Sequence, residues 1–292
     1  MPPRLVVPHR PSIFERSMLL KFLSYLALLS LAACASLSPP PEATHASSNP
    51  WEMGLVRTSH PTVKPAAVAS AVKAVPAAEL SRVVSASPWA HHLFPGKQAT
   101  QFTYARLDGR DTMAASAVSS ASMLRQSIRV EPMDLGQVRF SWKVPELIAQ
   151  ADMALREADD SPVRIVLAFE GHRSKFSARN AMLSALSHAI TGEPLPYATL
   201  MYVWCNTRPS GSVIINPRTD RIRKLVVESG ARHLNQWLDY ERDVRADFEK
   251  TFGEPPGALV GIGIMTDTDN TRSSSRAWYG PLKLFPVAFS KK

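Results

Sequence analysis

The chain has 292 residues and a formal net charge of +9, from 34 Lys and Arg against 25 Asp and Glu. These charges are interspersed, and the lack of a dense Lys/Arg tract argues against a nucleic-acid-binding protein. No Gly-x-Ser-x-Gly, His-Glu-x-x-His, phosphate-loop or dinucleotide-binding motif occurs, so the sequence indicates none of the common catalytic classes.

The first recognisable segment is an export signal that ends at Cys34. A basic residue precedes an apolar stretch at 22–31, which is too short for a membrane span because a spanning helix needs about 20 apolar residues. Small residues then precede Cys34, and this arrangement resembles the lipobox of bacterial lipoproteins. The resemblance implies lipidation of Cys34; an ordinary secretory signal that contains a cysteine is the alternative. Residues 1–17 do not look like the start of such a signal, so the true start is Met1 or Met18.

A lipidated Cys34 would anchor the protein in a membrane, because several acyl chains each contribute about 0.8 kcal/mol per buried methylene. Ala35 is not acidic, which in lipoproteins of this type implies sorting to the outer membrane. We therefore expect a bacterial outer-membrane lipoprotein that faces the periplasm or the cell surface.

Residues 35–88 are rich in proline, alanine and serine. Prolines at this density deny both helix and ladder hydrogen bonds, so the segment is predicted to be an extended tether. Residues 89–289 are then expected to form one globular domain, which is long enough for a single core. With Cys34 lipidated, only Cys205 remains, and we expect a buried free thiol.

The pattern within 89–289 is mainly β. Val138, Phe140 and Trp142 alternate with polar residues, which is typical of a half-buried antiparallel strand, and the segment at 163–169 repeats the pattern. Further strands are predicted at 101–106, 113–117, 123–130, 197–205, 213–215, 222–227, 259–265 and 282–285.

Two helices are predicted among these strands. Apolar residues share one stripe at 177–190, and Gly192 suits the C-terminal cap. At 239–252 apolar residues recur every four positions, with Asp239 as the N-terminal cap. Each stripe is expected to pack against a sheet. The predicted fold is a two-sheet, jelly-roll-like β-sandwich with two helical insertions.

Five short segments together resemble a known bacterial family. They are Phe-Glu-Gly at 169–171, Leu-Pro-Tyr-Ala-Thr-Leu-Met-Tyr-Val-Trp at 195–204, Thr-Asp-Arg-Ile-Arg at 219–223, Thr-Asp-Thr-Asp-Asn-Thr at 266–271 and Trp-Tyr-Gly at 278–280. The family is domain of unknown function 3047, and the resemblance extends over about residues 89 to 286. It implies no established activity and supplies no catalytic residues. It also implies similarity to the jelly-rolls of carbohydrate-binding modules.

One acidic loop is a candidate metal site. Asp267, Asp269 and Asn270 directly follow the strand predicted at 259–265, and their oxygens suit a hard cation such as a structural calcium. The block lacks the loop glycine of a calcium-binding repeat and has Trp278 in place of the last glutamate. A turn held by its own Asp and Asn side chains is the favoured alternative. No other cofactor is predicted.

Aromatic residues are the stronger functional clue. Trp237, Trp278 and Tyr279 border predicted turns, where exposed rings could stack on a sugar. Arg221 and Arg223 cluster near one strand end, where they could grip an acidic group or protect an edge strand.

Three functions therefore compete. A non-catalytic glycan- or cell-wall-binding domain, which we favour, predicts exposed aromatics in a groove. A polysaccharide hydrolase or lyase predicts two carboxylates that converge in such a groove. An envelope protein-interaction module predicts an exposed apolar patch.

Overall fold

The computed structural model describes Trp51 and residues 87–287, all of which belong to one compact unit. Cys34, the rest of the export signal and most of the predicted tether lie outside these residues. Within the described part of the chain, no helix is long and apolar enough to cross a membrane.

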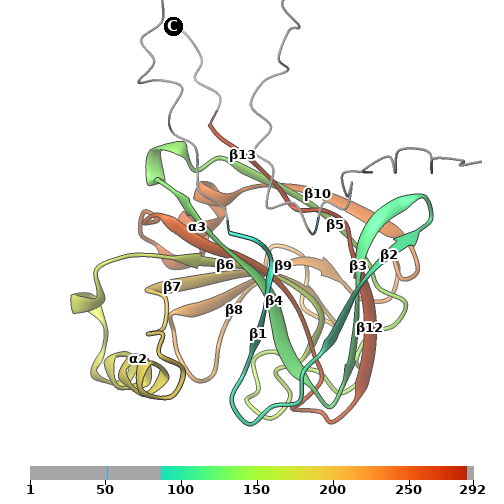
Figure 1. Cartoon of the computed structure of the whole chain (residues 1–292), viewed down its shortest axis with the longest axis horizontal. Helices are drawn as coiled ribbons and strands as arrows, with labels where there is room; N and C mark the ends of the chain where they lie inside the picture. The colour runs from blue at the N-terminus through green and yellow to red at the C-terminus, as the bar shows by residue number, and fades with distance from the viewer. Residues whose placement is uncertain (1–50, 52–86, 288–292) are drawn as a thin grey trace, which may run out of the picture. The chain divides into compact units, whose positions relative to one another are not determined.

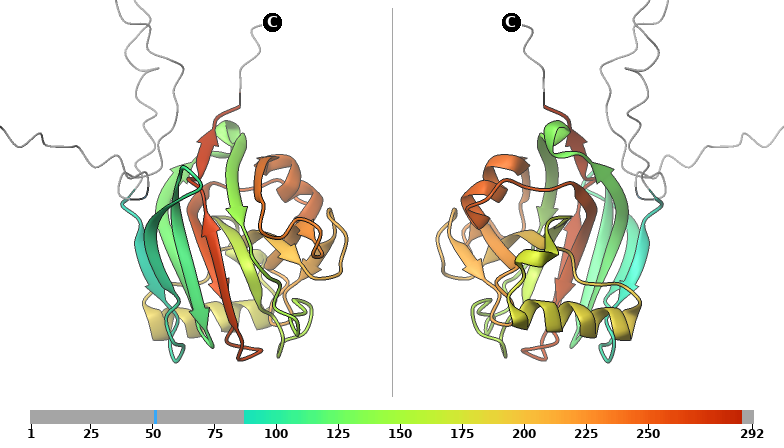
Figure 2. Two further views of the ribbon diagram at one scale, coloured as in Figure 1. Left: turned by 90° about the vertical axis from the view of Figure 1, so that its right-hand side faces the viewer. Right: turned by 90° about the vertical axis from the view of Figure 1, so that its left-hand side faces the viewer.

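Two sheets pack face to face (Figures 1 and 2). One has seven strands in the order β1 (Ala90–Leu93), β4 (Ala121–Val130), β11 (Leu259–Asp267), β6 (Ser161–Phe169), β7 (Ala198–Cys205), β9 (Ile222–Ser229) and β8 (Val213–Ile215). The six-stranded sheet has the order β10 (Trp237–Asp243), β5 (Gln137–Lys143), β12 (Ser274–Tyr279), β3 (Arg110–Val118) and β2 (Gln101–Leu107), and β13 (Lys283–Phe285) pairs with β5. Only β7 and β9 run parallel among these named strands. The predicted two-sheet, mainly β fold is confirmed.

The core lies between the two sheets and is built from the predicted alternation. Phe140 on β5 and Ile165 on β6 both point inward and are buried. The Phe140 ring stacks on Tyr202 of β7, with 5.6 Å between ring centroids, and so joins the two sheets. Burial of each such side chain contributes about 1.5–3 kcal/mol to folding.

Trp51 also belongs to this core, although it lies in the segment predicted to be a tether. Its side chain is only 4% exposed, and its ring centroid lies 5.0 Å from that of Trp89. At least one residue of the predicted tether is therefore part of the folded unit.

A strand and a short helix replace the single helix predicted at 239–252. Strand β10 ends at Asp243, and α3 (Val244–Phe252) begins at the next residue. Tyr240 follows the strand period and packs against Phe140 of β5 with 5.4 Å between ring centroids. The four-residue apolar spacing is helical only from Val244 onward. Asp243, not Asp239, caps the helix, since its carboxylate accepts a hydrogen bond from the Ala246 amide at 2.9 Å.

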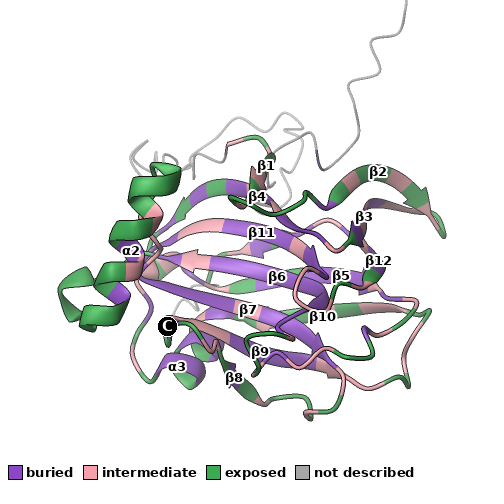
Figure 3. Cartoon of the chain, turned by 90° about the horizontal axis from the view of Figure 1, so that it is seen from below, coloured by how far each residue is buried: buried purple, intermediate pink, exposed green. Residues whose placement is uncertain are grey.

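Helix α2 (Ala178–Thr191) begins and ends close to the predicted residues, but its apolar side faces away from the domain. The Ser177 side chain caps its start, and Gly192 ends it with a φ of 76°. The apolar stripe was expected to pack on a sheet, but Met182, Leu186 and Ile190 are 64%, 54% and 58% exposed. The buried residues are Asn180 and Ser184, and Figure 3 shows the rest of the helix largely exposed at one end of the seven-stranded sheet.

Polar contacts explain this orientation. The Asn180 amide donates to the Asp220 carboxylate at 2.7 Å, and its oxygen accepts from the Thr219 hydroxyl at 2.8 Å. Near the other end of the helix, Glu193 pairs with Arg125 of β4. Side-chain hydrogen bonds and an ion pair thus hold α2 on the sandwich in place of apolar packing.

Candidate ligand-binding face

Two tryptophans share the outer face of the six-stranded sheet, on either side of Lys143. Trp237 lies directly opposite Lys143 in the β5–β10 pair, and Trp278 lies opposite the same residue in the β5–β12 pair. Residues directly opposite in antiparallel strands point to the same face. The neighbouring Trp142 points into the core, so this row points outward. Both outer indoles are partly exposed, and two strand spacings place their backbones about 10 Å apart.

Trp278 borders a shallow hollow of about 280 Å³ on this face. The small residues Ala114 and Ser116 of β3 lie beside it and leave room above the sheet. The polar side chains that line the hollow are Gln101, Thr103, Ser116 and Arg276. These groups can exchange hydrogen bonds with sugar hydroxyls, while the indole offers an apolar surface for a sugar ring.

Arg276 is the only charged residue that lines this hollow in the described part of the chain. It lies opposite Ser116 in the β12–β3 pair and is exposed. Within the described residues its guanidinium has no ion-pair or hydrogen-bond partner. A guanidinium stays charged at physiological pH and presents a planar fork that matches a carboxylate. The hollow can therefore accept an anionic group as well as an apolar ring.

The tip of the β2–β3 hairpin holds the side chain of Trp237. Oδ2 of Asp108 accepts hydrogen bonds from Nζ of Lys143 at 2.8 Å and from Nε1 of Trp237 at 3.0 Å. The hydrogen bond from Lys143 is the main cause that lowers the pKa of Asp108. The guanidinium of Arg110 lies 5.0 Å from the Trp237 ring centroid and also pairs with Asp239. Trp237 is thus held in one orientation, with one ring face covered by Arg110.

Tyr279 is not part of this face, contrary to the sequence-based expectation. Its side chain is 0% exposed and points into the core, because the residue follows Trp278 and strand neighbours point to opposite faces. Its hydroxyl donates to the Met265 carbonyl at 2.6 Å and lies 2.8 Å from the Thr266 hydroxyl. Tyr279 therefore joins the two sheets and cannot stack on a ligand.

Arg221 and Arg223 lie on the other sheet and also depart from the expectation. Arg221 pairs with Glu254 at 2.7 Å, and its guanidinium lies 4.0 Å from the Tyr197 ring centroid. Arg223 donates to the Thr251 carbonyl at 2.7 Å. These contacts fasten α3 and the loop after it to β9. The hollow that Arg221 lines has only about 20 Å³, which is room for about one water.

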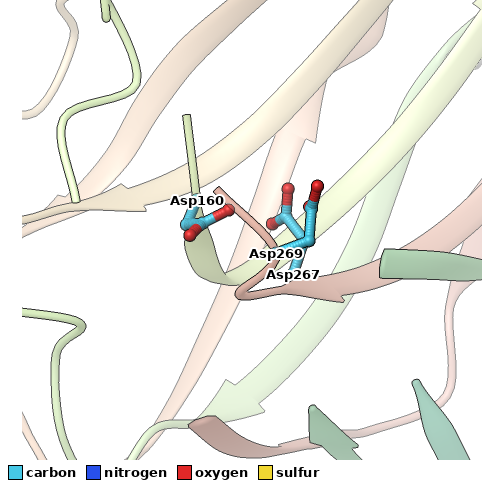
Figure 4. A group of neighbouring side chains, drawn as sticks. All are labelled: Asp160, Asp267 and Asp269. Carbon is cyan, nitrogen blue, oxygen red and sulfur yellow. The ribbon is translucent and has the colours of Figure 1, made fainter. Parts of the chain in front are cut away.

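Three carboxylates gather where β11 ends and β6 begins (Figure 4). One oxygen each of Asp160, Asp267 and Asp269 lies within 4.8 Å of the others. Protein cations already bind two of them, since Asp267 pairs with Arg164 and Asp269 pairs with Lys97. A metal ion would have to compete with both cations.

Asn270 and Thr271 complete this loop as hydrogen-bond donors. The Asn270 side-chain amide donates to Oδ1 of Asp160 at 2.9 Å, and the Thr271 backbone amide donates to Oδ2 at 2.7 Å. The predicted ligand Asn270 thus directs its side-chain NH₂ group, not its oxygen, to Asp160. These contacts favour the structural turn over a calcium site.

A model of the family described as "Protein of unknown function (DUF3047)" matches residues 87–283. The chain belongs to this family. The match confirms the resemblance seen in the sequence motifs. No curated protein matches the chain. Among solved structures, the DUF3047 chain is similar to the "Xyloglucanase domain of NopAA, a type three effector from Sinorhizobium fredii in complex with cellobiose", with a TM-score of 0.37 and 8% identity, over 70% of this chain and 97% of that chain. A likeness at this level carries no argument about ligand or activity.

The DUF3047 domain also contains a buried ion network that the sequence analysis missed. Asp159, which lies just before β6, accepts hydrogen bonds from Arg164 at 3.1 Å and from Lys224 at 2.6 Å. Burial, followed by the charge of Arg164, lowers the pKa of Lys224 to about 8. Asp267 and Asp159 raise the pKa of Arg164, although burial acts in the other direction. The available signal was Arg164 within the apolar run at 163–169 and Lys224 directly before the apolar run at 225–227.

Arg276 was not among the site residues predicted from the sequence. Strand β12 alternates between outward-facing and buried residues, and this period of two would have predicted the strand. The outward-facing residues are Ser274, Arg276 and Trp278, and the buried ones are Ser275, Ala277 and Tyr279. Recognition of the strand would have placed Arg276 and Trp278 on one face and Tyr279 on the other.

Proposed function

We propose that this domain binds a saccharide of the bacterial envelope without converting it, on the outer face of the six-stranded sheet. The hollow beside Trp278 carries the proposal, because it combines a partly exposed indole with hydroxyl, amide and guanidinium groups. Stacking on one aromatic ring contributes on the order of 1 kcal/mol beyond area burial, so the affinity of a single site should be modest.

The preferred ligand carries an acidic group. Arg276 supports this part of the proposal, since it is exposed in the hollow and no carboxylate among the described residues pairs with it. Acidic sugars and peptidoglycan fragments offer carboxylates next to sugar rings. Arg276 therefore takes the role that the sequence analysis gave to Arg221 and Arg223.

The competing function, cleavage of a polysaccharide, has less support. Glycoside hydrolysis needs two carboxyl groups about 5–9.5 Å apart, and the general acid needs a raised pKa. No carboxylate of the described residues lines the hollow. Asp108, on the same face, has a lowered pKa, which is the opposite of what a general acid requires.

The proposed location is the bacterial outer membrane, with Cys34 as the lipid anchor. The support is the lipobox-like sequence, which lies outside the described residues. A tethered domain in that compartment would meet peptidoglycan and surface polysaccharides.

Isothermal titration calorimetry on the chain from Ala35 onward, with peptidoglycan fragments and with matched acidic and neutral oligosaccharides, tests the function. Trp278→Ala should abolish the binding heat and keep the thermal transition, because the indole packs outside the core. Arg276→Gln should remove the preference for the acidic ligand and keep weak binding to its neutral counterpart.

Tyr279→Phe is the matched control. It removes a buried hydroxyl, so it should lower the melting temperature and leave binding at low temperature unchanged. Binding heat that survives Trp278→Ala would remove the hollow from consideration. If the intact protein gives no heat with any of these ligands, the saccharide proposal is wrong and the protein-interaction function becomes the better hypothesis.

A further inference from the structure

Helix α2 exposes an apolar surface that nothing in the described structure covers. Met182, Leu186 and Ile190 are spaced four residues apart, and all three are exposed. Eight residues of α-helix extend about 12 Å, so the three side chains form a continuous ridge of that length. We name this surface the α2 ridge.

The side of the helix that carries the α2 ridge is apolar except for one cation. At 100° per residue, Ala178, Ala185 and Ala189 fall on this side together with Arg179. Asn180 and Ser184 fall on the opposite side, where they are buried against the domain. The helix therefore packs its polar side against the domain and leaves its apolar side exposed.

The segment that forms α2 carries charge of one sign, and the Asp220 carboxylate contacts Asn180 on the side of the helix that packs against the domain. The sequence from 172 to 192 contains Arg173, Lys175 and Arg179 and no Asp or Glu. All three cations are exposed, and none forms an ion pair within the described residues. Glu193, the first acid after the helix, is occupied by Arg125 at 2.6 Å.

We propose that the α2 ridge is a membrane-docking surface that lies on the head groups of an anionic bilayer. An apolar helical face buried at the acyl boundary, with basic residues beside it, is the pattern of helices that lie in the membrane interface. Each nearby cation adds attraction to the negative surface potential of anionic lipid. Charge complementarity thus selects anionic lipid over a second copy of this chain, which would bring the same cations together.

The α2 ridge and the saccharide hollow lie on different parts of the sandwich. Figure 2 shows the outer face of the six-stranded sheet toward the viewer in its left panel, with α2 behind the lower end of that sheet. Docking through α2 would hold the domain in one orientation and leave the hollow free. The inference does not depend on the saccharide proposal.

Vesicle co-sedimentation tests the inference. The chain from Ala35 onward, which lacks Cys34 and therefore its lipid, is mixed with two kinds of vesicle. One is made of phosphatidylcholine alone, and the other contains equal parts of phosphatidylcholine and phosphatidylglycerol. We expect binding to the anionic vesicles that weakens with added salt, and little binding to phosphatidylcholine. Leu186→Asp should weaken binding on the order of tenfold or more, because it removes apolar burial and adds a repelled charge.

Met133→Asp is the matched control, since Met133 is 74% exposed but lies in the short 3-10 helix Pro132–Asp134, away from α2. It should bind vesicles as well as the unchanged protein, and both variants should keep the thermal transition. Equal binding by Leu186→Asp would overturn the proposal. Absence of vesicle binding by the unchanged protein would also overturn it. If sedimentation then showed a dimer that Leu186→Asp dissociates, the α2 ridge would be assigned to a second copy of the chain.

Discussion

The guanidinium of Arg164 holds both carboxylate oxygens of Asp267, with Nε 2.9 Å from Oδ1 and Nη2 3.0 Å from Oδ2. The two residues lie 103 positions apart in the chain, on adjacent strands of the seven-stranded sheet, and both side chains are almost fully buried. A two-pronged pair of this kind is the strongest common form of charge-assisted hydrogen bond.

Loss of one partner of this pair should be costly. Asp267→Asn is expected to lower the free energy of unfolding by about 3–5 kcal/mol, because Arg164 would keep a buried charge with one fewer partner. Urea denaturation measures the effect. Glu241→Gln is the control, since Glu241 pairs with Arg139 at the surface and should change stability by less than about 1 kcal/mol. A similar small effect for Asp267→Asn would contradict the buried pair.

Lys224 should add a pH dependence to stability. Its pKa falls from an ordinary value near 10.4 to about 8 in the folded protein, mainly through burial. Between these values the unfolded chain binds more protons, so this group makes the folded state more stable as the pH rises from 8 to 10. Relative to Lys224→Met, the protein should gain on the order of 2 kcal/mol over that range. Lys250→Met, at an exposed position, is the control substitution. A pH-independent gap for Lys224→Met would refute the assignment.

The boundary between β10 and α3 can be tested by two aspartates four residues apart. Asp243→Ala should cost about 1 kcal/mol, because it removes the cap on the Ala246 amide. Asp239→Ala removes only an exposed ion pair with Arg110 and should cost less than that. Thermal or urea unfolding compares them. A larger cost for Asp239→Ala would support the single helix that the sequence indicated.

Calcium should have no effect on this domain. Asp160, Asp267 and Asp269 are each bound by protein donors, and a cation would have to displace Arg164 or Lys97. The melting temperature should therefore be the same with added calcium and with a chelator. An increase with calcium that Asp269→Asn abolishes would establish the metal site.

Lipidation should depend on Cys34. Metabolic labelling with a palmitate analogue is expected to mark the unchanged protein and not Cys34→Ala, because the sulfur carries the diacylglyceryl group in lipoproteins. Membrane fractionation should place the labelled protein in the outer membrane. Equal labelling of both forms would leave an ordinary secretory signal as the better interpretation, and recovery from the inner membrane would disprove the sorting.

The sequence by itself determined the local features of this fold. Alternation in β5 and β6 placed Phe140 and Ile165 in the core, because successive strand residues must point to opposite faces. The cap residues Ser177 and Gly192 set the ends of α2, because each satisfies backbone groups of its own helix. These features depend on interactions within a few residues of the chain, and such interactions can be read from spacing.

Only the tertiary structure decided which surfaces carry the candidate functions. The apolar period of α2 predicted a buried stripe, but hydrogen bonds from Asn180 to the segment before β9 turned that stripe outward. Trp237 and Trp278 are neighbours only because β10 and β12 both pair with β5 at Lys143. Strand order and register are set by contacts between distant segments, and the periodicity of a single strand contains no information about its neighbours.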